Sequence, residues 1–207
     1  MVTIVDYGAG NLTSVRLAFD ALDTETQITN VPAAILQADR VVFPGVGAAG
    51  AAMKKLAELD LIEVLKTVIE QGKPFLGICL GTQIIFERSE EDAGVNGIGL
   101  VPGTVKLFDR SDSLVKVPHM GWNNVELIRR HPVFEGIESG SEFYFVHSYY
   151  PVPSERNDLL GETEYAQVRF ASAIGKENII ATQFHPERSG RIGLKLLENF
   201  TRWNGSC

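Results

Sequence analysis

The chain has 207 residues, of which 44% are hydrophobic and 22% are charged, proportions typical of a soluble globular protein. This length predicts one domain that spans residues 1–207. The formal net charge of −7 argues against a nucleic-acid-binding surface, and no apolar run reaches the length of a membrane-spanning helix.

The first half alternates short apolar runs with helical patterns. Three runs are typical of buried strands that end in turns: VTIV (residues 2–5), RVVFPGVG (40–47) and PFLGI (74–78). Apolar residues at helical spacing follow the first two runs. Asn11 is the expected cap of the first helix, and a break near Asp60 is expected in the second helical stretch. Strand and helix in alternation predict βαβ units and a mostly parallel sheet.

The second half is rich in glycine, proline and aromatic residues from Gly94 to about Phe170. Runs such as FYFVHSYY (143–150) and YAQVRF (165–170) predict antiparallel strands on one edge of the sheet. NIIATQF (178–184) returns to the buried-strand pattern, and a helix closes the chain. The expected fold class is therefore α/β, a mostly parallel sheet with an antiparallel edge extension.

The two cysteines, Cys79 and Cys207, form no disulfide framework, which predicts a reducing, cytoplasmic location. The N-terminal run lacks a basic segment, so we do not expect a signal peptide. No CxxC pair or histidine cluster has metal-ligand spacing, and we expect no metal. DYGAGN (6–11) has only half of a dinucleotide-binding GxGxxG pattern, because Thr13 replaces the third glycine. We therefore expect no cofactor.

Cys79 stands in FLGICLGTQ (75–83), between a predicted strand and a predicted helix. The pattern G-x-C-x-G has the spacing of a nucleophile elbow, with Cys in place of Ser. Gly77 and Gly81 give a strained turn its clearance, and the positive end of the following helix favours a thiolate. The alternative is a cysteine packed as a small apolar core residue.

A cysteine nucleophile needs a base and a group that orients the base. His185 follows a buried strand, where active sites gather in open α/β sheets. Glu187 lies two residues on, so it can face the same way as His185. A strand-end turn with a surface glutamate is the other interpretation. His131 is predicted to lie in a solvated turn, whereas His119 and His147 could be structural.

The chemistry of acyl transfer also needs donors for an oxyanion. The backbone N–H of Leu80, next to the nucleophile, is one candidate. The glycine-rich segment FPGVGAAG (43–50) is the second, because its glycines let a peptide N–H turn inward. A plain strand-to-helix turn is the alternative for this segment.

Together, GICLGTQ (77–83), FPGVG (43–47) and FHPE (184–187) resemble the motifs of the class I, triad-type glutamine amidotransferases. Within that family the chain most resembles the glutaminase subunits of imidazole glycerol phosphate synthases. The motifs that carry this narrower resemblance are DYGAGN (6–11), PGVG (44–47), RSEE (88–91), PHMGWN (118–123), FVHSYY (145–150) and FHPERSG (184–190).

The resemblance implies a flavodoxin-like sheet with helices on both faces and a specific chemistry. Glutamine would be hydrolysed to glutamate and ammonia through a thioester on Cys79, with His185 as base and Glu187 as its orienter. A peptide flip at Val46 would complete the oxyanion hole. The residues carried over from the family are, for the oxyanion hole, Val46, Gly47 and Leu80, and, for glutamine binding, Gly47, Gln83, Glu91, Ser148 and Tyr149.

One departure from the family pattern is Thr82, where many members carry methionine, and we expect a packing change there. The acidic residues 90–92 are expected near the end of the helix that follows Cys79. There they would oppose the helix dipole, and a solvated charge run is their alternative interpretation. A carboxylate that receives the α-ammonium of glutamine would explain one of them, and the resemblance selects Glu91.

The implied partner is a (βα)₈-barrel synthase subunit, which forms a heterodimer with this chain and uses the ammonia in histidine biosynthesis. DYGAGN and PHMGWN should face it, and the interface residues implied are Asn11, Trp122 and Arg188. For Trp122, a partly buried position in the core is the alternative interpretation. No nucleic acid or membrane partner is expected. Three alternatives remain: a glutaminase subunit of another synthase, such as pyridoxal phosphate synthase; a cysteine hydrolase on a related fold; and a non-catalytic interaction protein.

Overall fold

The computed structural model describes residues 1–8, 11–109 and 116–206. Ala9 and Gly10 of the DYGAGN motif, as well as Cys207, lie outside the described residues. The helices and strands, in chain order, are β1 (Val2–Val5), α1 (Leu12–Asp20), β2 (Thr26–Thr29), α2 (Pro32–Leu36), β3 (Val41–Gly45), α3 (Ala49–Glu58), α4 (Leu61–Glu70), β4 (Phe75–Cys79), α5 (Leu80–Ile84), β5 (Phe86–Ser89), η1 (Glu91–Ala93), β6 (Val95–Asn96), β7 (Val101–Leu107), β8 (His119–Leu127), η2 (Pro132–Phe134), β9 (Ser141–His147), β10 (Tyr149–Pro153), η3 (Arg156–Asp158), β11 (Leu159–Tyr165), β12 (Val168–Lys176), β13 (Ile179–Thr182), η4 (Pro186–Arg188) and α6 (Gly190–Arg202).

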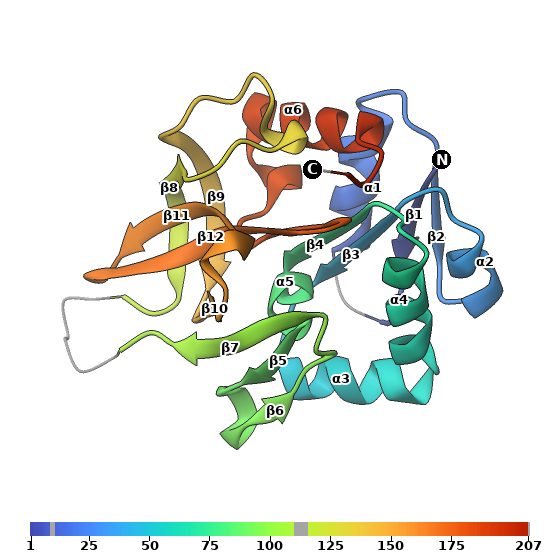
Figure 1. The fold of residues 1–207 in the computed structure, drawn as a ribbon, viewed down its shortest axis with the longest axis horizontal. Coiled ribbons are helices and arrows are strands. Elements are labelled where there is room, and N and C mark those ends of the chain that lie inside the picture. Colours follow the sequence, from blue (N-terminus) through green and yellow to red (C-terminus); the bar gives the residue numbers. More distant parts are fainter. Residues whose placement is uncertain (9–10, 110–115, 207) are drawn as a thin grey trace.

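A nine-stranded sheet forms the centre of the molecule, with the strand order β2-β1-β3-β4-β13-β12-β11-β8-β9 (Figure 1). The first five strands of this order pair in parallel, and the remaining pairings are antiparallel. The parallel part has the flavodoxin-like order 2-1-3-4-5. The predicted fold class, a mostly parallel sheet with an antiparallel edge extension, is confirmed.

Helices cover both faces of the parallel strands. The face covered by α1 and α6 packs Phe19 and Phe200 against strand residues such as Ile4. The opposite face packs α2, α3, α4 and α5 against strand residues such as Phe43 and Phe75. Figure 1 shows α1 and α6 on one side of the sheet and α3 and α4 on the other. Strands β1, β3 and β4 are buried along their whole length, which explains their unbroken apolar sequences.

The register of the parallel strands brings three strand ends together. Gly45 at the end of β3 pairs with Cys79 at the end of β4. On the other side of β4, Thr182 at the end of β13 pairs with Ile78. The segments that leave these strands, including Val46 and His185, therefore start beside Cys79.

A second, four-stranded sheet of order β10-β7-β5-β6 packs below the first in Figure 1. The sequence did not predict it. FYFVHSYY is not one strand, because it breaks at Ser148 into β9 of the large sheet and β10 of the small one. YAQVRF is not one strand either, although its two ends belong to the antiparallel strands β11 and β12. Ala166 and Gln167 have φ angles of 53° and 61°, so they form the hairpin turn between β11 and β12.

The predictions for the first two helical stretches were correct in position but not in every detail. The predicted break near Asp60 is confirmed, because Asp60 is left-handed and separates α3 from α4. α1 begins after Asn11 as expected, but Asn11 is itself left-handed and its side chain does not cap a backbone N–H. Its oxygen accepts a hydrogen bond from the Ser14 hydroxyl instead.

Candidate active site

Cys79 occupies a strained turn at the junction of β4 and α5. Its φ of 54° and ψ of −108° lie in a region that non-glycine residues rarely adopt. Gly81 makes the turn possible, since a Cβ atom there would lie 1.9 Å from the carbonyl oxygen of Phe43. The side chain is buried and its thiol is free. This geometry is that of a nucleophile elbow, although α5 is only five residues long.

His185 and Glu187 form a buried pair beside this cysteine. The Nδ1 atom of His185 lies 2.7 Å from Oε1 of Glu187, and their side chains are 3% and 1% exposed. Because a carboxylate only accepts hydrogen bonds, Nδ1 carries the proton and Nε2 is the free end of the ring. No hydrogen bond to Nε2 is made by the residues that the structure describes.

The protonation of His185 is linked to the charge on Cys79. Burial acts to lower the pKa of His185, but a thiolate on Cys79 and the Glu187 carboxylate outweigh it and raise the pKa to about 10. The imidazolium is therefore the favoured form of this ring whenever the sulfur is negative. The three side chains can store and move one proton next to a nucleophilic sulfur.

A cavity of about 570 Å³ opens over the sulfur, a suitable size for an amino acid. Every residue predicted for the oxyanion hole and for glutamine binding lines this cavity. Its lining consists of Val46, Gly47, Cys79, Leu80, Gln83, Glu91, Pro118, Val146, His147, Ser148, Tyr149 and His185. The chain segments that meet here are far apart in sequence and are brought together by the strand ends of both sheets.

Glu91 does not lie where the sequence placed it. The helix after Cys79 ends at Ile84, and strand β5 separates it from the acidic residues. Glu91 instead accepts a hydrogen bond of 2.7 Å from the N–H of Ala49, and Asp92 accepts one of 3.2 Å from Gly50. These carboxylates complement the N-terminus of α3 rather than oppose a helix dipole. The hydrogen bond uses Oε2 of Glu91, so Oε1 is left to contact a ligand in the cavity. Burial raises the pKa of this carboxyl, although the hydrogen bond from Ala49 acts in the opposite direction.

Gln83 projects into the same cavity with a fixed orientation. Its Nε2 donates to the carbonyl of Tyr149 at 2.8 Å and to Oε1 of Gln183 at 3.0 Å. Its own oxygen is thus the group available to a ligand. The neighbouring Thr82 is buried and donates to the carbonyl of Thr182 at 2.6 Å. The threonine at this position, where many family members carry methionine, therefore links α5 to β13 by a hydrogen bond.

The segment Val46–Gly47 separates the cavity over Cys79 from a second one of about 280 Å³. Gly47 has a φ of 96°, and Val46 is 39% exposed. The buried hydroxyl of Tyr7, on the side of the second cavity, has no hydrogen-bond partner among the described residues. A peptide in this segment has space on both sides.

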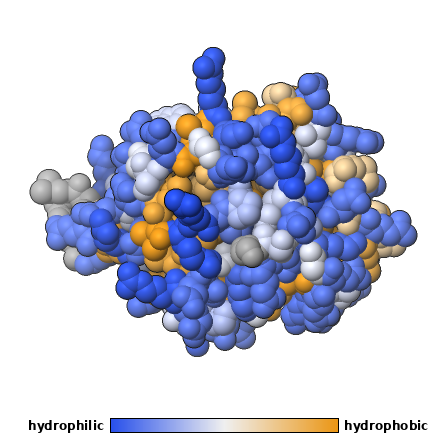
Figure 2. Space-filling view, turned by 45° about the horizontal axis from the view of Figure 1, so that its top comes forward, coloured by the Kyte–Doolittle hydropathy of each residue, from blue (hydrophilic) through white to orange (hydrophobic). Residues whose placement is uncertain are grey.

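The residues predicted for a partner interface lie outside the cavity. Trp122 is 54% exposed. Its ring lies 6.1 Å from that of Tyr144, and the guanidinium of Arg188 lies 5.9 Å from the Tyr144 ring. Asn11 borders a small hollow together with Glu187. The view in Figure 2 is mainly hydrophilic, with hydrophobic side chains in small separate groups.

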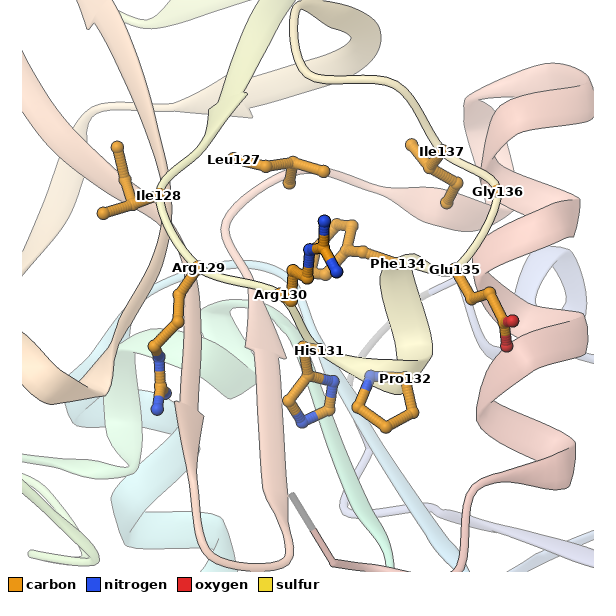
Figure 3. A pocket seen from close by; sticks show the side chains of 10 residues that line it. All are labelled: Leu127, Ile128, Arg129, Arg130, His131, Pro132, Phe134, Glu135, Gly136 and Ile137. Carbon is orange, nitrogen blue, oxygen red and sulfur yellow. The ribbon is translucent and has the colours of Figure 1, made fainter.

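A larger hollow, about 680 Å³, lies along residues 127–137, from the end of β8 to just past η2. Figure 3 shows Arg129 and Arg130 among its mainly apolar lining, which includes neither cysteine nor serine. The prediction for His131 in this loop was wrong. It is 5% exposed, its ring packs edge-on against Trp203, and burial together with Arg129 lowers its pKa to about 4.

Two other kinds of feature are absent from the part of the chain that the structure describes. In residues 1–8, 11–109 and 116–206, no group of three histidine, cysteine or acidic side chains is arranged to hold a metal ion. Over the same ranges, every helix is too short or too polar to cross a membrane. The sequence did not single out Gln183 or Tyr7, and it indicated His119 only as a structural histidine.

Comparison with known proteins assigns the chain to a family. The model of the family "Glutamine amidotransferase class-I" matches residues 3–203. A solved structure described as a glutamine amidotransferase has a TM-score of 0.72 at 16% identity and covers 98% of each chain. The structure of a glutamine amidotransferase from Thermotoga maritima has a TM-score of 0.67 at 16% identity, covering 97% of this chain and 82% of that one. The chain therefore belongs to the class I glutamine amidotransferases.

Full-length relatives narrow this assignment. The protein named imidazole glycerol phosphate synthase subunit HisH in Methanocaldococcus jannaschii is 48% identical over 200 residues, which covers 97% of this chain and 98% of that protein. The HisH subunit of Nitrosococcus oceani is 47% identical over 206 residues, covering 99% and 98%. The resemblance deduced from the sequence motifs, both to the family and to these subunits, is confirmed.

Proposed function

We propose that this chain is the glutamine-hydrolysing subunit of an imidazole glycerol phosphate synthase. The observation that carries the proposal is the strained Cys79 turn, which lies beside the buried His185–Glu187 pair on the wall of a cavity of amino-acid size. The match over nearly the full length to relatives named HisH supports the assignment to imidazole glycerol phosphate synthase. The proposed location is the cytoplasm, and the proposed unit is one domain over residues 1–207.

The reaction follows from the proton held by the Cys79–His185 pair. The thiolate of Cys79 adds to the carboxamide carbon of glutamine. Nε2 of His185 gives its proton to the nitrogen, which leaves as ammonia, and a thioester remains. Water then adds to the thioester carbonyl while His185 takes up a proton. Cleavage of the C–S bond releases glutamate and restores the thiolate.

Two acceptors in the cavity suit the α-ammonium group of glutamine. Glu91 contributes a carboxylate, and Gln83 contributes its side-chain oxygen, because its N–H groups already donate to Tyr149 and Gln183. Gly47, Ser148 and the backbone of Tyr149 complete the proposed glutamine contacts along the cavity wall. A charge-assisted hydrogen bond to a carboxylate favours an amino acid over an uncharged amide.

The proposed oxyanion donors are the N–H of Leu80 and an N–H of the Val46–Gly47 segment. Both segments border the cavity beside Cys79. A flip of the Val46 peptide is supported by the free space on both sides of the segment. Such a flip would let a partner with bound ligand switch the hydrolysis on.

The proposed partner is a (βα)₈-barrel synthase subunit that receives the ammonia. A closed route suits this chemistry, because ammonia released into neutral water is protonated to ammonium. The exposed cluster of Trp122, Tyr144 and Arg188 is the proposed docking surface, together with Asn11. A half-exposed tryptophan beside an arginine has the composition of an interface hot spot.

The test uses the complex of this chain with the synthase subunit. In the Cys79→Ala complex, formation of imidazole glycerol phosphate should stop with glutamine as nitrogen donor and resume with ammonium salt at mildly alkaline pH. Trp122→Ala should lower glutamine-dependent synthesis while ammonia-dependent synthesis survives. If ammonium fails to restore synthesis in an assembled Cys79→Ala complex, the proposed division of labour is wrong.

A further inference from the structure

Among the described residues, two polar groups outside the triad lie near the sulfur of Cys79. The side-chain Nε2 of Gln183 and the carbonyl oxygen of Val146 each lie 3.7 Å from it. Gln183 is completely buried between β13 and His185. An amide N–H can only donate, whereas a carbonyl can only accept from a thiol S–H. Gln183 therefore supports the thiolate, and Val146 supports the uncharged thiol.

The orientation of the Gln183 amide is fixed by a neighbouring backbone carbonyl. The oxygen of Tyr149 can only accept, so Gln83 must turn its Nε2 toward it, at 2.8 Å. The same NH₂ group lies 3.0 Å from Gln183, which must therefore present its oxygen to Gln83. The remaining end of Gln183, its NH₂ group, points to the Cys79 sulfur.

A second arm of hydrogen bonds reaches the same carbonyl from strand β8. Nδ1 of His147 lies 2.8 Å from the Tyr149 oxygen, so it carries the proton and Nε2 of His147 accepts. His119 then donates through Nδ1 at 2.9 Å. Its own Nε2 accepts from the NH₂ group of Asn123 at 3.2 Å.

Both histidines are suited to this fixed direction because they stay neutral. They are 3% and 5% exposed, and burial lowers the pKa of His119 to about 4 and that of His147 to about 3. His119 is also stacked between the rings of Phe145 and Tyr165, at 4.8 and 4.0 Å. A neutral, stacked ring holds one tautomer and one orientation.

We infer that Gln183 is a positioning residue that stabilises the Cys79 thiolate, held in place by a hydrogen-bond chain that runs from Asn123 through His119, His147, Tyr149 and Gln83. The inference deepens the proposed function and rests on Cys79 as its nucleophile. Every direction in the chain follows from one acceptor, the Tyr149 carbonyl. A break at either end therefore loosens the groups between.

The experiment measures alkylation of Cys79 by iodoacetamide as a function of pH in the full-length chain. Gln183→Met keeps the side-chain volume but cannot donate to the sulfur. We expect its alkylation at pH 7 to fall about tenfold, since hydrogen bonds to charged groups are strong, and to match the wild type at high pH, where the thiolate forms regardless. The titratable groups that line the cavity of the sulfur or lie beside it are unchanged in this variant: His185, Glu187, His147, Glu91 and Tyr7.

Matched controls separate positioning from the general loss of a buried amide. Asn178 is buried at the other end of β13, where its NH₂ group donates to the carbonyls of Ile69 and Lys73 at 3.1 and 2.6 Å. Asn178→Leu should lower the melting temperature but leave the alkylation profile unchanged. If Gln183→Met does not fold, Gln183→Glu still accepts from Gln83, and its like charge should slow alkylation further.

The histidine arm is tested with His119→Phe, which keeps the stacked ring but removes both nitrogen atoms. We expect a smaller shift of the alkylation profile in the same direction. We expect no shift in His131→Phe, because His131 is a buried histidine that takes no part in the hydrogen-bond chain. In the double variant with Gln183→Met, the His119 effect should vanish, because the sulfur is already disconnected. If the effects of His119→Phe and Gln183→Met simply add, the hydrogen-bond chain does not connect His119 to the sulfur. A wild-type alkylation profile for Gln183→Met would overturn the inference.

Failure of the inference is distinguishable from failure of the proposed function. If alkylated wild-type chain still releases ammonia from glutamine in the complex, Cys79 is not the nucleophile and the proposed function fails. If alkylation blocks ammonia release while the Gln183 variants react like the wild type, only the positioning role is lost.

Discussion

Replacement of Glu187 by glutamine is the sharpest test of the roles assigned to the buried pair. The Oε1 atom of Glu187 lies 2.7 Å from Nδ1 of His185, and both side chains are almost fully buried. Glutamine can still accept this hydrogen bond, so the tautomer of His185 is kept. What is lost is the negative charge that stabilises the imidazolium.

The magnitude follows from the two kinds of hydrogen bond. A bond to a charged group contributes about 1.5–3 kcal/mol and a neutral one about 0.5–1.5, so the loss is about 1–2 kcal/mol. This converts to a fall in kcat/KM of about 5- to 30-fold. Removal of the base itself in His185→Ala should cost more, about 10²–10⁴-fold. The loss of the carboxylate also lowers the pKa of His185, which is about 10 in the native site, so activity should decline at a lower alkaline pH.

The assay is ammonia release from glutamine, measured from pH 6 to pH 10 in the complex with the synthase subunit. Circular dichroism of each variant serves as the control for folding. A Glu187→Gln variant that is less active than His185→Ala would refute the assignment of base and orienter. An alkaline limit that does not move would show that Glu187 does not act through the charge on His185.

Four further outcomes are expected. Gly81→Ala should lower the stability by about 2 kcal/mol or more, seen as a drop in melting temperature, because the new methyl group would meet the Phe43 carbonyl oxygen at 1.9 Å. The pKa of buried His131 is lowered to about 4 in the folded protein. As the pH decreases from about 6.5 to 4, His131 takes up a proton in the unfolded protein but not in the folded one, so the stability falls. His131→Phe should flatten that fall in urea titrations by up to about 1.4 kcal/mol per pH unit. Glu91→Gln should raise the KM for glutamine about tenfold or more while kcat changes less, since a charge-assisted contact to the ammonium is lost but the amide oxygen still accepts from Ala49. The chain alone should hydrolyse glutamine about 10²–10³-fold more slowly than its complex if one oxyanion donor is missing at rest; equal rates would contradict the proposed gating.

The elements that the sequence predicted correctly are those with a local cause. Short β-branched runs that end in glycine specify the buried parallel strands, and the G-x-C-x-G spacing specifies the turn at Cys79. The joint position of Val46, Cys79 and His185 also follows from a local rule, since parallel strands deliver their carboxyl ends to one edge. This is why the motif positions led directly to the cavity.

The features that were missed depend on partners far along the chain. His131 is buried because Trp203, at the end of α6, covers it, and nothing near position 131 indicates this. Ser148 divides an apparently continuous strand because β10 finds its partner in β7, more than 40 residues earlier. Gln183 contacts a sulfur 104 positions away. Pattern reasoning reaches such contacts only once the strand order is known.

The acidic run shows how a sound physical rule can be applied to the wrong element. Carboxylates do oppose a helix C-terminus, but the nearest helix in space is α3, and Glu91 and Asp92 meet its N-terminus. This placement ties two proposed parts of the site together. Glu91, the proposed ammonium receptor, holds the N–H of Ala49, which lies two residues after Gly47 of the proposed oxyanion segment. An ammonium group bound to Oε1 of Glu91 would weaken the hydrogen bond that its Oε2 accepts from Ala49. Through this one side chain, substrate binding would affect the conformation of the oxyanion segment.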